Sequence, residues 1–104
     1  MDVISNVMLD HYLTGLVSKF FKILPMKEAG EASLCDYMSS LQVELIGCKG
    51  VIESLQEDAM YLTLISILEY LINEECEVRV VKREVFKAIS ICKKLRKRYA
   101  SNKE

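Results

Sequence analysis

The chain is poor in residues that break helices and in residues that build catalytic or metal sites. Among its 104 residues are one proline, four glycines, one histidine and no tryptophan. So few breakers predict long, uninterrupted secondary-structure elements. A single histidine excludes metal centres that need two, such as the paired Glu-x-x-His motifs of di-iron bundles. We therefore expect a regular fold without a metal or a cofactor.

The cysteines also lack the spacing of a functional site. Cys35, Cys48, Cys76 and Cys92 form neither a CxxC pair nor a set with zinc-ligand spacing. Since no secretory signal is visible, we interpret them as reduced thiols in a cytoplasmic protein. The longest run without charge, residues 59–68, is far shorter than the roughly 20 residues that span a bilayer. The sequence therefore predicts no transmembrane segment.

Motifs that hold phosphates or activate a nucleophile are absent as well. The glycines form neither G-x-G-x-x-G nor the P-loop pattern, and no G-x-S-x-G elbow occurs. His11 follows Asp10, but neighbouring positions on a helix point about 100° apart, so Asp10 does not orient the imidazole. We expect a protein that is not an enzyme and in which His11 is a structural residue.

Apolar residues recur with the period of a helix in most of the chain, at steps of three and four residues. The stripes are Leu9, Leu13, Leu16, Phe20 and Ile23; Leu34, Met38, Leu41, Leu45 and Cys48; and Val78, Val81, Val85, Ala88, Cys92, Leu95 and Tyr99. With the apolar segment between them, they predict helices at about 2–22, 31–49, 54–73 and 79–100, followed by a frayed tail at 101–104. The fold class is all-α, a single four-helix bundle-like domain of residues 1–100.

Several residues predict where these helices begin and end. Leu24-Pro25 should end the first helix, because proline disfavours helical geometry in the residue before it, and residues 27–30 should form a polar connection. Gly50 is the expected stop of the second helix. Ser54 and Glu57 have the spacing of a capping box at the start of the third helix.

The third predicted helix is apolar nearly all round between residues 59 and 68. A helix of that kind is buried on most sides. We therefore expect it to be largely buried, packed by the other three helices or by a second subunit. A homodimer would bury any apolar excess.

The charges are sorted along the chain. Residues 1–78 hold 4 Lys/Arg against 13 Asp/Glu, whereas residues 79–104 hold 10 against 2. Such asymmetry predicts a partner for the basic end: the acidic part of the chain, a second copy or a polyanion.

The basic fourth helix holds the only candidate binding residues. They are Arg83, Lys87, Lys93, Lys94, Arg96, Lys97 and Arg98. No Asn or Gln lies among residues 93–99 to read bases, so any nucleic-acid contact would be to phosphates. The same residues could instead form a solvated face that pairs with acids of this chain or of a partner.

Two functions follow. The leading hypothesis is a small interaction or adaptor protein that acts through protein–protein contacts or self-association. The alternative is a nucleic-acid-associated protein that binds phosphates through the basic C-terminal helix. A basic amphipathic helix on a membrane surface ranks third, because its apolar stripe is needed for the core.

Overall fold

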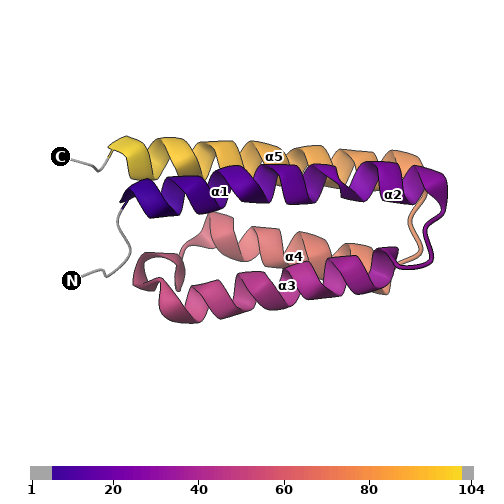
Figure 1. The fold of residues 1–104 in the computed structure, drawn as a ribbon, viewed down its shortest axis with the longest axis horizontal. Coiled ribbons are helices and arrows are strands. Elements are labelled where there is room, and N and C mark those ends of the chain that lie inside the picture. The colour runs from indigo at the N-terminus through magenta and orange to yellow at the C-terminus, as the bar shows by residue number, and fades with distance from the viewer. Residues whose placement is uncertain (1–5, 102–104) are drawn as a thin grey trace.

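The structure, a computed structural model, describes residues 6–101 as helices joined by short turns (Figure 1). The elements are α1 (Asn6–Phe21), α2 (Ile23–Ala29), α3 (Leu34–Val51), the 3-10 turn η1 (Glu53–Leu55), α4 (Ala59–Asn73) and α5 (Val78–Ser101). No strand occurs among these residues, so the predicted all-α class is confirmed. Of the tail predicted at 101–104, Ser101 is the last residue of α5. Residues 102–104 and the part of the first helix predicted over residues 2–5 lie outside the described residues.

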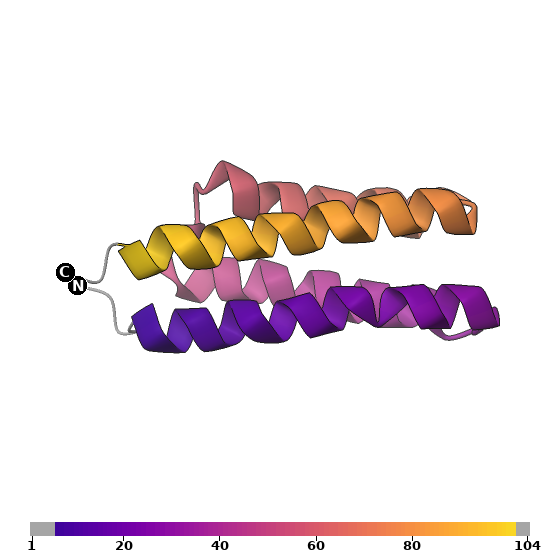
Figure 2. The ribbon, with the colours of Figure 1, turned by 90° about the horizontal axis from the view of Figure 1, so that it is seen from above.

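These elements form a four-helix bundle, because α1 and α2 together make one interrupted rod (Figures 1 and 2). The rod lies beside α5 and antiparallel to it, and α3 and α4 form a second antiparallel pair. Successive helices alternate in direction along a body of 44 × 21 × 19 Å. Short turns favour this up-down order, since they join helices that are neighbours in space.

The core consists of the stripes that the sequence predicts. Every residue of the first stripe is buried, and so are most residues of the other two. The largest fully buried side chains are Tyr61, Phe20, Leu13, Leu16, Ile23, Leu45, Leu55, Leu64, Leu68 and Leu95. They come from all four corners of the bundle, so one apolar core holds the helices together.

The first helix is interrupted at Lys22 and resumes as α2. Pro25 has no N–H to donate to the carbonyl of Phe21, four residues earlier, and α1 ends at Phe21. Proline is tolerated in the first turn of a helix, where its N–H would have no helical partner. The Met26 N–H then donates to the Lys22 carbonyl at 3.4 Å. The first helix thus ends at Phe21, close to the predicted end at about residue 22, but the sequence did not predict that the rod resumes as α2 and continues to Ala29.

Gly30 ends α2 through its left-handed backbone. Its φ of 67° is the only positive φ among the described residues. The Gly30 N–H donates to the Lys27 carbonyl at 3.1 Å, and the Glu31 N–H donates to the Met26 carbonyl at 3.0 Å. This pair of bonds is the Schellman motif. Residues 27–29, predicted as a polar connection, are helical, and the turn begins at Gly30.

The connection from α3 to α4 differs from the prediction at both ends. Gly50 has no positive φ and lies within α3, which continues to Val51. Asp58, and not Ser54, caps α4: its Oδ1 accepts the N–H groups of Met60 and Tyr61 at 2.9 and 3.2 Å. Ser54 lies in η1, where the buried Leu55 anchors the turn in the core. The predicted capping box is therefore wrong.

The third predicted helix, α4, shares the core with the other helices and occupies one corner of the bundle (Figure 2). It buries one face, made of Tyr61, Leu64, Ile67, Leu68 and Leu71. Leu62, Ser66 and Tyr70 are exposed. The expectation of a third helix packed on most sides by the other three is thus corrected, because the four helices pack around a common axis.

Candidate functional site

The seven basic residues predicted as a contact site divide into paired arginines and outward-facing lysines. Arg83, Arg96 and Arg98 each place a guanidinium nitrogen within 3.0 Å of a carboxylate oxygen of this chain. Lys87, Lys93, Lys94 and Lys97 are exposed on the outer side of α5. The exposed lysines are therefore accessible to a partner, and the three arginines form ion pairs within the bundle.

Arg98 belongs to a buried cluster around Asp58. The Asp58 side chain is 3% exposed, and its Oδ2 accepts from Arg98 Nη1 at 2.5 Å and from the Tyr99 hydroxyl at 2.8 Å. The same hydroxyl lies 3.1 Å from the Ser54 carbonyl oxygen. Burial, followed by the bond to Asp58, raises the pKa of Tyr99. This cluster fixes the basic end of α5 to the start of α4.

Two further ion pairs involve the predicted residues. Arg96 Nε lies 3.0 Å from Asp10 Oδ1 and joins α5 to α1. Arg83 Nε lies 3.0 Å from Glu84 Oε2, and the Glu84 side chain is largely buried. The Arg96–Asp10 and Arg98–Asp58 pairs satisfy part of the charge asymmetry within one chain, whereas Arg83 and Glu84 both belong to the basic segment.

An apolar groove of about 590 Å³ runs between the α1–α2 rod and α5. Figure 2 views the bundle from the side on which these helices lie. The wall on the rod contains Val17, Phe21 and Pro25, and the wall on α5 contains Phe86 and Ile89. Phe21 is 50% exposed and Phe86 is 46% exposed. Two aromatic side chains thus remain half in solvent beside a groove that nothing in the described chain fills.

The polar residues that line this groove include two cations and no acid. Lys22 and Lys93 stand on opposite walls, with Ser18 beside them. The Lys22 ammonium lies 5.4 Å from the centre of the Tyr37 ring, an exposed cation–π contact worth about 0.5–1 kcal/mol. Lys93 makes no ion pair with a described residue.

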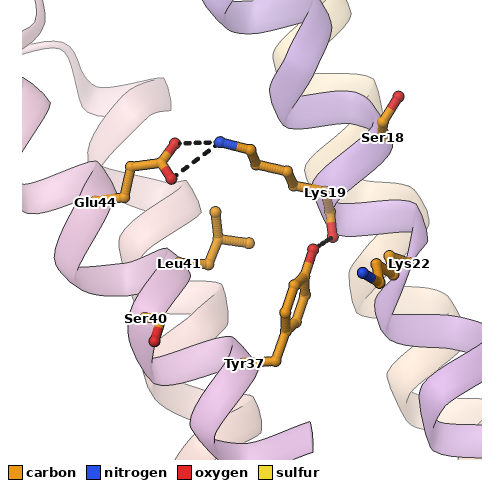
Figure 3. A pocket seen from close by; sticks show the side chains of 7 residues that line it. All are labelled: Ser18, Lys19, Lys22, Tyr37, Ser40, Leu41 and Glu44. Atoms are coloured by element: carbon orange, nitrogen blue, oxygen red, sulfur yellow. Dashed lines mark hydrogen bonds and ion pairs between the residues drawn. The ribbon is translucent and has the colours of Figure 1, made fainter.

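Lys22 and Ser18 also border a second, polar hollow between α1 and α3 (Figure 3). Lys19 Nζ donates to both carboxylate oxygens of Glu44, at 3.0 and 2.8 Å. The Tyr37 hydroxyl donates to the Lys19 carbonyl at 2.8 Å. The Lys19–Glu44 ion pair and the Tyr37 hydrogen bond therefore hold α1 against α3.

A second apolar surface covers the outer side of α3 and has no charged residue at its centre. Val43 is 68% exposed and Val51 is 72% exposed, and Ile46 is exposed between them. Gly47 and Gly50 share this side of the helix, and a Cβ at either would meet nothing within 4 Å. A shallow hollow of about 390 Å³ lies beside this surface, and Gly47, Cys48, Val51 and Ile52 line it with Glu44 at its edge.

Burial keeps the side chains of Cys92, Tyr12 and Tyr61 in their neutral forms. Burial raises the pKa of the Cys92 thiol to about 12, so it is protonated at neutral pH. Burial also raises the pKa of Tyr12 and Tyr61, whose hydroxyls face one another. Tyr61 donates to the Leu45 carbonyl at 2.7 Å. A fully buried, protonated thiol does not act as a nucleophile, and these groups serve the core.

The remaining chemical candidates do not assemble into a site. His11 is exposed on the outer side of α1. Among residues 6–101, no three His, Cys, Asp or Glu side chains lie close enough together to hold a metal ion. None of the described helices is both long and apolar enough to cross a membrane.

Neither the groove nor the α3 surface is predicted from the sequence. Phe86 lies outside the predicted stripe of the last helix, and the structure leaves this ring about half exposed. A signal was available, because Phe86 lies among lysines and arginines on the side opposite the stripe. On α3, the matching signal was a helix side without charge where solvent-facing residues are usually charged.

Comparison with known proteins gives no relative: no family model, no curated protein and no solved structure matches this chain.

Proposed function

We propose that this chain is a small non-enzymatic interaction protein that binds other proteins through two exposed apolar surfaces. The single observation behind the proposal is that bulky apolar side chains stay exposed on two different sides of one well-packed bundle. Isolated exposed apolar residues are ordinary on protein surfaces, whereas groups of them beside a groove commonly mark binding surfaces. A chain with two such surfaces can act as an adaptor.

The α3 surface is assigned to a second copy of this chain, which makes the protein a homodimer. Glycine inside a helix costs about 0.5–1 kcal/mol relative to alanine. Gly47 and Gly50 have negative φ and no close neighbour, so nothing within the bundle requires them. They allow another helix to approach closely, and Val43 and Ile46 supply apolar side chains that such a helix can cover.

A symmetric contact suits this surface. An antiparallel pair of α3 helices centred between Ile46 and Gly47 places each Ile46 opposite Gly47 of the other copy. The same register places Val43 opposite Gly50, so large side chains meet glycines throughout. Because no charge lies at the centre, the twofold symmetry brings no like charges together.

Thermal unfolding at several protein concentrations tests this proposal. A dimer that unfolds to separate chains melts at a higher temperature as concentration rises. We expect this dependence in the wild type and its loss in Ile46→Glu. Ser66→Glu places the same charge on the exposed side of α4 and should keep the dependence. A melting temperature that is independent of concentration in the wild type would contradict self-association.

The nucleic-acid function remains the second candidate, favoured by the four exposed lysines on α5. Arg98 is unsuitable for testing it, because its loss would disturb the Asp58 cluster. Lys87→Glu with Lys94→Glu changes the exposed charge without touching a described ion pair. Phosphate binding should weaken in this double variant and fall steeply as salt rises. Oligonucleotide binding that is unchanged in the double variant would exclude this candidate.

The proposal places the protein in the cytoplasm. Four free cysteines support a reducing compartment, because secreted domains of this size commonly pair theirs.

A further inference from the structure

We infer that the groove between the α1–α2 rod and α5 binds an acidic amphipathic helix of a partner protein. The inference rests on the proposed function and adds the chemistry of the partner to it. It uses a surface on a different side of the bundle from α3, so the two claims can fail separately.

The spacing of the groove residues indicates a helical occupant. Val17, Phe21 and Pro25 follow one another at steps of four along the rod. Phe86, Ile89 and Lys93 follow at steps of three and four along α5. Both walls therefore run parallel to the bundle over about two helical turns. An amphipathic helix offers apolar side chains at the same i, i+3, i+4 and i+7 spacing.

The exposed rings supply the apolar contact. Phe21 and Phe86 come from opposite walls, and each has about half of its surface in solvent. Between them, Ile89 is nearly buried and forms part of the floor. Leucine or phenylalanine side chains of a partner helix could be covered on both sides by these rings. Aromatic side chains of this kind commonly dominate the energy of an interface.

The charges that line the groove determine which charge a partner helix must carry. The groove is lined by Lys22 and Lys93 and by no acidic residue. Lys82 lies four residues before Phe86, on the same side of α5. A helix with Glu or Asp flanking its apolar stripe would meet opposite charges along the α5 wall, whereas a basic helix would be repelled.

The probe for this inference is a synthetic amphipathic peptide of about five helical turns, with Leu and Phe on its apolar stripe and Glu elsewhere. A matched peptide carries Lys at every Glu position. Fluorescence anisotropy should show that the acidic peptide binds and that the basic peptide does not. Binding should weaken as salt rises, because charges at the rim are screened. Equal binding of the two peptides would overturn the inference.

Single variants then locate the binding. Phe86→Ser should lower the affinity for the acidic peptide by at least about tenfold, since it removes a central aromatic contact. Val43→Ser removes an exposed apolar side chain from α3 and should leave the affinity unchanged. Phe86 is 46% exposed and Val43 is 68% exposed, so both variants should keep the wild-type circular dichroism spectrum. Equal effects of the two substitutions would contradict the groove as the site.

Two neighbouring lysines give the matched test of charge. Lys93 lines the groove, whereas Lys94 lies about 100° further round α5 and does not. Lys93→Glu should lower the affinity for the acidic peptide several-fold more than Lys94→Glu does, although both variants change the net charge equally. An equal loss of affinity in both variants would mean that peptide binding depends on the overall charge of α5 and not on the groove. That result would overturn the inference.

Self-association is measured separately from peptide binding. The titrations are repeated in Ile46→Glu, where the proposed dimer should be absent, and we expect the same affinity for the acidic peptide. A dimeric wild type that binds no peptide would overturn the inference about the groove and leave the proposed dimer intact. A monomeric wild type that binds the acidic peptide would remove the proposed dimer and support the inference. An oligonucleotide that binds where the peptide does not would overturn it in favour of a polyanion.

Discussion

At the scale of single residues, Asp58 links two distant parts of the chain. One oxygen of its carboxylate caps α4, and the other accepts from Arg98 and Tyr99 near the end of α5. A carboxylate that is almost fully buried needs such partners, because an unpaired charge inside a protein is strongly unfavourable. The bonds from Arg98 and Tyr99 therefore stabilise the contact between α4 and α5, and those from the backbone stabilise the start of α4.

We predict that Asp58→Ala lowers the free energy of unfolding by about 2–4 kcal/mol, from loss of a cap and of a charge-assisted hydrogen bond. Asp58→Asn should cost less, since asparagine also caps helices and only the negative charge is lost. Urea unfolding of the two variants and the wild type gives both values. Equal losses in the two variants would show that capping contributes little at this position.

Cys92 gives a prediction about alkaline pH. Its pKa is about 12 in the folded chain against 9.0 for an ordinary cysteine, because burial disfavours the thiolate. The folded state therefore keeps its proton while the unfolded state loses it, so stability is full below pH 9.0 and falls as pH rises towards 12. Unfolding at a series of pH values should show a steeper alkaline loss in the wild type than in Cys92→Ala. Parallel curves would contradict this account of Cys92.

At the scale of elements, the helix ends show which features the sequence encodes locally. The period of apolar residues predicts the buried side of each helix, because three- and four-residue steps are a local property of the chain. Ser54 and Asp58 are both good capping residues before the same apolar run. The choice of Asp58 depends on Arg98 and Tyr99, about 40 residues later in the chain, so it follows from packing.

Two glycines near helix ends give predictions of opposite sign for the free energy of unfolding. Gly30→Ala should lower the free energy of unfolding by about 1–2 kcal/mol, because a side chain is disfavoured at positive φ. Gly50→Ala should raise it by about 0.5–1 kcal/mol at concentrations where the chain is monomeric, because alanine favours the helix. Denaturant unfolding of dilute protein measures both changes. A loss of stability in Gly50→Ala under these conditions would show that glycine is needed within the single bundle.

At the scale of the whole molecule, the sorted charges are only partly explained by the fold. The acidic part supplies Asp10 and Asp58 to Arg96 and Arg98 of α5. The exposed lysines of α5 lie outside these pairs and leave one side of the bundle basic. The sequence shows the imbalance, but the pairs join residues 86 and 40 positions apart and depend on how the helices pack.

The candidate surfaces were harder to predict than the fold. A side chain such as Phe21 or Phe86 is apolar whether it is buried or exposed, so composition alone does not distinguish core from binding surface. The distinction depends on how the rod packs against α5, because Phe21 and Phe86 line the groove between them.

The proposed homodimer is tested most directly by the absolute mass of the wild-type protein in solution, from light scattering on gel filtration at low and at high salt. The account predicts the mass of a dimer at both salt concentrations, because the α3 surface is apolar and uncharged at its centre, and the mass of a monomer for Ile46→Glu. A wild-type protein that is monomeric at both salt concentrations would contradict the central claim that α3 forms the interface between two copies.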